Sequence, residues 1–123
     1  MKTWMIIAVL SLGLFIAWPT TATPPFTAII IDSGAPYFVP KSAIVPSGAP
    51  IRWDNSTATE HTITHVGCLE DGNACAFDSG IVRPTDGFAL PGLAPGRYPY
   101  LCRLHPIMHG IITVMDTFAP SQL

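Results

Sequence analysis

The sequence predicts an all-β domain, built as an antiparallel sandwich or barrel of about seven short strands. Three observations lead to this fold class. Thirteen prolines and ten glycines in 123 residues interrupt the chain too often for long helices. Short β-branched or alternating segments recur every 8–12 residues or so, with turn residues between them. No segment has a convincing helical period in its apolar residues.

The expected strands share a β-branched or aromatic composition and are bounded by turn-forming residues. In chain order they are residues 27–32, 44–45, 51–54, 60–66, 88–90, 98–102 and 110–115. The first contains the run Ile29–Ile31, and the third follows the turn Ser47–Pro50. In the fourth, His61, Ile63 and His65 are expected on one face of the strand, because successive side chains alternate.

Composition and charge exclude two function classes. Hydrophobic residues make up 49% of the chain and charged residues only 11%, so disorder driven by low hydrophobicity and high charge is excluded. The net charge is −2 and there is no basic run, which excludes a basic nucleic-acid binder. The length suits one domain, and the chain contains no internal repeat or linker.

Residues 1–22 are interpreted as a secretory signal peptide. Lys2 supplies the positive start, Trp4–Trp18 is uncharged and almost wholly apolar, and Pro19 precedes small residues suited to cleavage. The apolar stretch is 15 residues long, shorter than the roughly 20 that a spanning helix needs. The alternative is an uncleaved N-terminal anchor, in which case the protein would be attached to a membrane.

We therefore expect an exported protein, periplasmic or extracellular. Residues 23–36 are expected to form a tether and the first strand, and residues 37–123 the rest of a single domain. In an exported chain disulfides persist, and three cysteines leave one thiol over. Cys68 and Cys75 flank a polar loop that a disulfide could pin, which leaves Cys102 free. Asn55-Ser56-Thr57 also fits a glycosylation sequon.

The chemically informative cluster surrounds the remaining thiol. Cys102, His105 and Met108 lie within seven residues, and His61 lies on an earlier expected strand. Two imidazoles, a thiolate and a weak axial thioether are the ligand set of a mononuclear blue-copper electron-transfer site. Soft sulfur ligands suit Cu(I), and imidazoles suit both oxidation states. The sequence therefore indicates one copper ion held by these four residues.

Several alternatives remain open at this stage. Taken singly, a cysteine is most often a small buried apolar residue, and a histidine or methionine is more often packed or exposed than a ligand. Tetrahedral zinc also binds His and Cys, although a thioether ligand argues against it. A nucleophilic Cys–His pair needs an orienting Asn or Asp, which the loop lacks. His65 could replace His61 as the upstream ligand, although we interpret His65 and His109 as exposed polar residues.

From Tyr37 to Met115 the chain resembles a small cupredoxin of the plastocyanin and amicyanin group. Residues 98–110 resemble the C-terminal copper loop, with the short amicyanin-like spacing between its three ligands. Residues 51–55, followed by 61–63, resemble the strand that ends in the first ligand; residues 77–80 and 93–98 also resemble family segments. Thr62 is a departure, because many relatives have Asn there, so the surroundings of the Cys102 sulfur are expected to differ.

The resemblance implies a Greek-key β-sandwich of seven to eight strands with one type 1 copper ion. Its ligands would be His61, Cys102, His105 and Met108, and the protein would transfer single electrons without acting as an enzyme. Electrons would enter and leave near His105, Pro106 and Ile107. The expected partners are redox proteins that bind transiently, and the protein itself is expected to be a monomer. A copper carrier with the same ligands is the alternative function.

Overall fold

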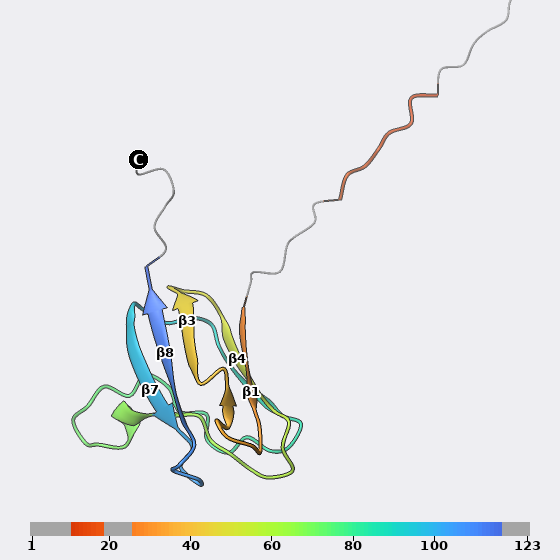
Figure 1. Ribbon diagram of the computed structural model, residues 1–123. Helices are drawn as coiled ribbons and strands as arrows, with labels where there is room; N and C mark the ends of the chain where they lie inside the picture. Colours follow the sequence, from red (N-terminus) through yellow and green to blue (C-terminus); the bar gives the residue numbers. More distant parts are fainter. Residues whose placement is uncertain (1–10, 19–25, 117–123) are drawn as a thin grey trace, which may run out of the picture.

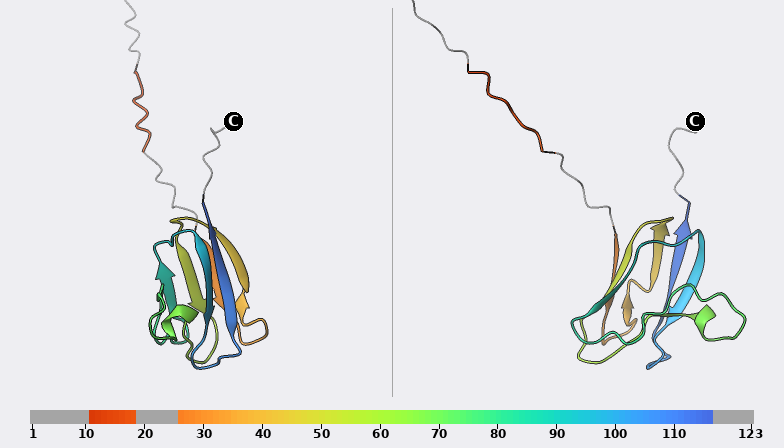
Figure 2. Two further views of the ribbon diagram at one scale, coloured as in Figure 1. Left: turned by 90° about the vertical axis from the view of Figure 1, so that its left-hand side faces the viewer. Right: turned by 180° about the vertical axis from the view of Figure 1, so that it is seen from behind.

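The computed structural model describes residues 11–18 and 26–116. Residues 26–116 form two four-stranded sheets that pack face to face (Figures 1 and 2). One sheet has the strand order β2-β1-β4-β6 and the other β3-β8-β7-β5. The elements are β1 (Thr27–Ile31), β2 (Phe38–Val39), β3 (Ser42–Pro46), β4 (Ile51–Asn55), β5 (Thr64–His65), η1 (Val66–Cys68), β6 (Gly87–Leu90), β7 (Gly96–Leu101) and β8 (His109–Met115). The all-β sandwich and its strand number are confirmed.

The sheets are mixed, so the expectation of purely antiparallel pairing is wrong. Strand β1 runs parallel to β4, and β3 runs parallel to β8, whereas the other pairs are antiparallel. Parallel neighbours need a crossover connection rather than a hairpin. Here the crossover connection is made by strands in the opposite sheet, because the chain crosses from one sheet to the other and back. The spacing of strands along the sequence does not reveal such a crossing.

Alternating burial along the longer strands builds the core between the sheets. Strands β1, β3, β4 and β8 each bury every second residue, as the pleat requires when one face is packed and the other is exposed. Trp53 of β4 lies at the centre, with its ring 5.6 Å from Tyr100 of β7 and 5.8 Å from both Phe77 and Phe88. These contacts tie the two sheets together and give the loops at their ends a rigid support.

The fourth expected strand is only partly a strand. Regular pairing is confined to Thr64–His65, and His61 is joined to Val82 by an isolated bridge. The Thr62 and Thr64 hydroxyls lie 3.0 Å apart on one side of the segment, as the expected alternation requires. However, His61, Thr62, Ile63 and Thr64 are all buried, so neither face of the segment is exposed. The reason is that this segment is covered on both sides, by residues 77–82 and by the segment that carries Cys102.

The loop between β7 and β8 lies at the lower end of the sandwich in Figure 1, opposite the end of β8. The chain that follows β4 reaches the same end, where His61 meets Cys102. Residues 68–75 form a separate loop that projects beside β7 in Figure 1 and in the right view of Figure 2.

The expected signal peptide lies mostly outside the described residues, as do residues 23–25 of the tether and residues 117–123. Residues 11–18 are described as exposed chain without regular secondary structure. Within the described parts of the chain, no helix has the length and apolar character needed to cross a membrane.

Candidate metal centre

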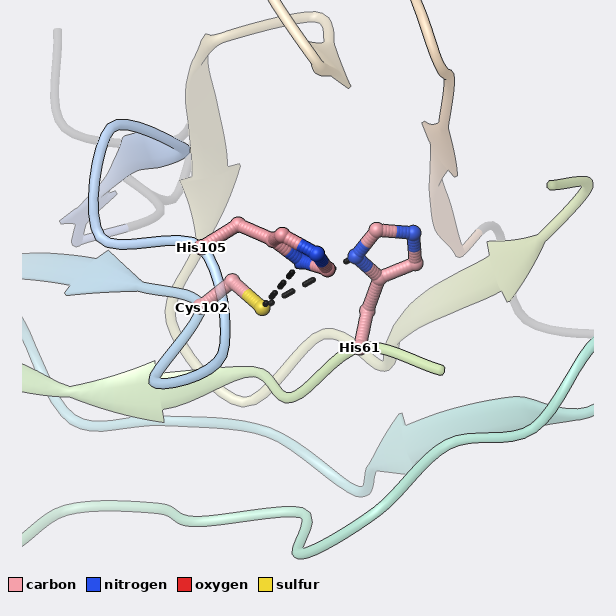
Figure 3. A group of neighbouring side chains, drawn as sticks. All are labelled: His61, Cys102 and His105. Atoms are coloured by element: carbon pink, nitrogen blue, oxygen red, sulfur yellow. Dashed lines mark hydrogen bonds between the residues drawn. The ribbon is translucent and has the colours of Figure 1, made fainter. Parts of the chain in front are cut away.

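Three of the four predicted ligand residues meet around one point. Cys102 Sγ lies 3.7 Å from Nδ1 of His61 and 3.7 Å from Nδ1 of His105 (Figure 3). The donor atoms of these residues all lie within 4.8 Å of one another. Cys102 and His61 are buried, whereas His105 is exposed. The residues come from two segments 41 positions apart, so the sandwich itself assembles the site.

Two backbone hydrogen bonds close the short loop that carries the other donors. Cys102 N–H donates to the Met108 carbonyl at 3.0 Å, and Met108 N–H donates to the His105 carbonyl at 2.8 Å. The side chain of Met108 is only 3% exposed and lines one hollow together with His61 and His105. The loop thus brings a thioether, a thiol and an imidazole to the same end of the sandwich.

Two threonine hydroxyls fix the ring of His61. Its Nε2 lies 2.9 Å from Thr57 Oγ1 and 3.0 Å from Thr59 Oγ1. The Thr57 proton has two other partners, Asn55 Oδ1 at 2.7 Å and the Thr59 carbonyl at 3.1 Å, and both can only accept. In the tautomer with the imidazole proton on Nε2, Thr57 accepts from His61 and the Nδ1 lone pair faces Cys102.

Asn55 organises the loop that leads to His61. Its buried side chain donates to the carbonyls of Thr59 and Val82 at 2.8 and 3.1 Å, and accepts from Thr57 N–H at 3.0 Å. A glycan on this amide nitrogen would require those bonds to break, so the Asn55 sequon is not a glycosylation site in this fold. Sequence reasoning missed the structural role of Asn55, Thr57 and Thr59, although closely spaced polar residues just before His61 were the available signal.

The surroundings of His61 also favour its neutral form. Burial lowers the pKa of His61, and the nearby His105 lowers it further. A metal ion binds only the neutral imidazole, so this shift prepares the ring for coordination.

The Cys102 sulfur receives a backbone hydrogen bond from the segment of the first histidine. Thr62 N–H donates to Cys102 Sγ at 3.3 Å, in a fully buried environment. The Thr62 hydroxyl accepts from Arg103 N–H at 2.8 Å. The sulfur is therefore held between the two segments that carry the candidate ligands.

The other two histidines do not join the cluster. His65 Nδ1 accepts from Ala76 N–H at 3.1 Å, and its ring packs 5.5 Å from Phe77 and 5.7 Å from Tyr98. Burial lowers its pKa, and the side chain is half-buried rather than exposed as expected. His109 is exposed, as expected, and lies 2.9 Å from the Ile107 carbonyl, to which its Nδ1 donates.

The remaining predicted residues lie as follows. Cys68 and Cys75 form a disulfide across the projecting loop, and Cys102 is the free cysteine. His105, Pro106 and Ile107 are all exposed, with 70% of Ile107 accessible. Beside them opens a hollow of about 230 Å³, whose other walls include Asp32, Tyr37 and Thr59.

The donor set fits copper better than the other candidate metals. Two imidazoles, one buried cysteine sulfur and an adjacent thioether are soft or borderline donors, and no carboxylate within the described residues joins the cluster. A two-sheet β-sandwich that carries these donors at one end defines a protein built to hold a single type 1 copper ion.

Comparisons with known proteins agree with this class. No family model matches the chain. Chloroplastic plastocyanin of Chlamydomonas reinhardtii is 29% identical over 103 residues, which cover 80% of this chain and 69% of the plastocyanin. A purple cupredoxin from Nitrosopumilus maritimus is 25% identical, with a TM-score of 0.60 over 72% of this chain and 99% of that one.

Two further structures share the fold. An amicyanin variant in its reduced Cu(I) form has a TM-score of 0.63 at 21% identity, over 77% of this chain and 87% of its own. A copper-containing nitrite reductase from Thermus scotoductus has a TM-score of 0.67 at 21% identity, over 84% of this chain but 25% of the enzyme. Together with the donor set, these likenesses support a small blue copper protein of the cupredoxin family, similar in sequence to plastocyanin and in fold to amicyanin.

Proposed function

We propose that this protein is an exported one-electron carrier whose single copper ion is held by His61, Cys102, His105 and Met108. The observation that carries the proposal is the position of Cys102 Sγ, buried and 3.7 Å from both Nδ1 atoms. Bound copper would supply the Cu(II)/Cu(I) couple. The chain's part is to hold the donors in one arrangement, which keeps the reorganisation on electron transfer small.

The rigidity of the donors supports this role. His61 is clamped by Thr57 and Thr59, and Cys102 is held by the Thr62 N–H and by the backbone bond to Met108. Such outer hydrogen bonds fix ligand orientation and tune the metal. Burial of Cys102 and Met108 keeps water from the sulfur donors.

The exposed edge of His105 is the proposed electron port. His61 is 4% exposed, so His105 is the imidazole that a partner can approach closely. Pro106 and Ile107 surround it with apolar surface, and Leu104 is 47% exposed beside them. A small apolar patch suits a transient redox partner, since such encounters bury less than about 1,200 Å². We propose a monomer that converts no substrate and binds no nucleic acid.

Export is supported by two features of the chain. The disulfide between Cys68 and Cys75 is typical of proteins outside the reducing cytosol. The apolar segment Trp4–Trp18 suits a signal peptide, and the protein is attached to a membrane only if that segment is retained. A periplasmic or extracellular location follows from this proposal.

Carriage of copper is the competing function, because the same ligands could deliver the ion and the hollow beside His105 gives a route for its exchange. The test loads the protein with Cu(II) and records its visible spectrum. An intense thiolate-to-copper band, and redox cycling much faster than copper loss to a chelator, would support electron transfer. Copper loss faster than redox cycling would favour carriage, and a colourless protein that takes zinc but not copper would contradict both.

A further inference from the structure

A continuous chain of hydrogen bonds runs from the residue after Cys102 to an acidic residue on a third segment. Arg103 N–H donates to Thr62 Oγ1 at 2.8 Å, and Thr62 Oγ1 lies 3.0 Å from Thr64 Oγ1. Thr64 Oγ1 donates to Asp78 Oδ1 at 3.0 Å. The other oxygen of Asp78 accepts from the Arg103 guanidinium at 2.9 Å, which closes the chain into a ring.

The direction of every bond in this ring is determined. The carboxylate of Asp78 can only accept, so the single hydroxyl proton of Thr64 points to it. Thr64 must then accept from Thr62, which in turn accepts from the Arg103 backbone. A chain in which all donors point the same way and end on a carboxylate is strengthened by polarisation.

The ring joins the two segments that meet at the sulfur. Thr62 follows His61, and Arg103 follows Cys102, so the ring ties the neighbours of two candidate ligands to each other. The same Thr62 donates its N–H to Cys102 Sγ at 3.3 Å. Thr62 and Thr64 are 3% and 0% exposed, so water does not replace their hydroxyl partners.

Asp78 is held in its charged form. Burial alone would raise its pKa, but bonds from the Gly80 N–H, the Arg103 guanidinium and the Thr64 hydroxyl, with the charge of Arg103, together lower it. The segment of Asp78 is itself fixed to Ile63, since Ser79 N–H donates to the Ile63 carbonyl and Ser79 Oγ accepts from Ile63 N–H. The carboxylate is thus a firm anchor for the ring.

We propose that Asp78 is a positioning residue for the Cys102 sulfur: through Thr64, Thr62 and Arg103 it holds the Thr62 N–H in place as a donor to Sγ. A donated N–H stabilises negative charge on the sulfur and weakens its donation to a bound metal ion. It therefore favours the reduced state of the site. The effect on reduction potential rests on the proposed copper site, whereas the effect on the Thr62 amide does not need the metal.

The test uses two variants that break the ring of hydrogen bonds and one variant that preserves it. Asp78→Ala removes the anchor, Thr64→Val removes only the hydroxyl, and Thr64→Ser restores that hydroxyl. Asp54→Ala is the matched control, because Asp54 pairs with Arg52 at 2.8 Å on the exposed face of β4, away from the site. The readouts are amide hydrogen exchange of Thr62 and Arg103 in the metal-free protein, and the reduction potential of the copper-loaded protein.

We expect exchange of both amides to accelerate about tenfold or more in Asp78→Ala and Thr64→Val. The equilibrium constant for reduction should fall about threefold or more in the same two variants, as expected for one weakened hydrogen bond. Thr64→Ser and Asp54→Ala should stay within about twofold of the parent in both measurements.

Unchanged exchange and unchanged potential in Thr64→Val would overturn the proposal. If Asp78→Ala does not fold, the Thr64 pair decides the question, because valine keeps the shape of the buried side chain. If the parent binds no copper, the proposed function fails on that ground, and amide exchange still decides whether Asp78 positions Thr62.

Discussion

His61 Nε2 lies 2.9 Å from Thr57 Oγ1, a hydroxyl whose proton has two other partners that can only accept, Asn55 Oδ1 and the Thr59 carbonyl. With the imidazole proton on Nε2 and donated to Thr57, Nδ1 presents its lone pair to Cys102. The orientation of one candidate ligand is therefore set by a residue four positions earlier, through a loop that Asn55 holds in shape.

Replacing Thr57 by valine should loosen the ring of His61. The substitution keeps the volume of the side chain and removes the hydroxyl acceptor, so Nε2 retains only the Thr59 hydroxyl as a partner. We expect copper affinity to fall about 10–100-fold, the usual cost of losing an outer partner of a ligand. Competition with a chelator measures the change, and Thr57→Ser, which keeps the hydroxyl, should bind as the parent does. Equal affinity in Thr57→Val would show that the bond does not matter for binding.

Replacing Cys102 by serine should abolish the intense visible band of the copper-loaded protein. The band arises from thiolate-to-copper charge transfer, and a hydroxyl oxygen cannot supply it at visible wavelengths. Cys102 is the free cysteine, so the substitution leaves the Cys68–Cys75 disulfide intact. Circular dichroism should confirm that the variant keeps its fold. A band that persists in Cys102→Ser would rule out Cys102 as the sulfur ligand.

Removing the disulfide should lower stability without altering the site. In the chain-entropy model, a loop closed between Cys68 and Cys75 contributes about 2–3 kcal/mol to the free energy of unfolding. The double substitution to alanine should lower the denaturant midpoint accordingly and leave the visible band unchanged. Denaturant titration and spectroscopy of the same sample test both points. Non-reducing peptide mapping of the parent should find Cys102 outside any disulfide.

The pattern of the sequence predicts those features that depend on near neighbours. Runs of β-branched residues indicate β1 and β8, the turn before Ile51 indicates β4, and the grouping of Cys102, His105 and Met108 indicates the site. The residues 60–66 mislead, because their coverage comes from residues 77–82, whose position follows only from the tertiary fold. Strand β2 was not predicted, since Phe38–Val39 is too short to show a period.

The same limit applies to the outer part of the site. The roles of Asn55 and Thr57 depend on bonds to the Val82 carbonyl and to His61, and Asp78 reaches Arg103 from 25 positions away. Residue types that can ligate metal are recognisable alone, whereas polar residues that orient a ligand are recognisable only once their partners are placed.

The free energy of unfolding of the metal-free protein should decline as the pH falls below the pKa of an unperturbed histidine side chain. Burial lowers the pKa of His65 below its unfolded value of about 6.5, so the unfolded chain binds more protons in that range. The stability that neutral His65 contributes is present above pH 6.5 or so and is lost as the pH falls further. Denaturant unfolding from pH 8 to pH 5 measures this loss of stability, because carboxyl groups titrate mostly below that range. His65→Gln should flatten the decline; an equally steep decline in that variant would assign it to other groups, such as His61.

A charge beside His105 should slow electron exchange between two copies of the protein. If electrons pass through the exposed edge of His105, two molecules must bring their Ile107 side chains close together, so Ile107→Lys places like charges at the contact. Electron self-exchange, measured by NMR line broadening in mixtures of the oxidised and reduced forms, should slow about tenfold or more at low salt and recover partly at high salt. Ile44→Lys is a matched control, because Ile44 on β3 is 71% exposed against 70% for Ile107 and lies opposite Thr113, within the sheet. Both variants add the same charge to the same molecule, so a slowing confined to Ile107→Lys locates the contact at the β7–β8 loop. Each lysine also reduces the net charge of −2, so equal acceleration in both variants would mean that net charge governs the encounter. No slowing in Ile107→Lys relative to Ile44→Lys would place the electron port elsewhere.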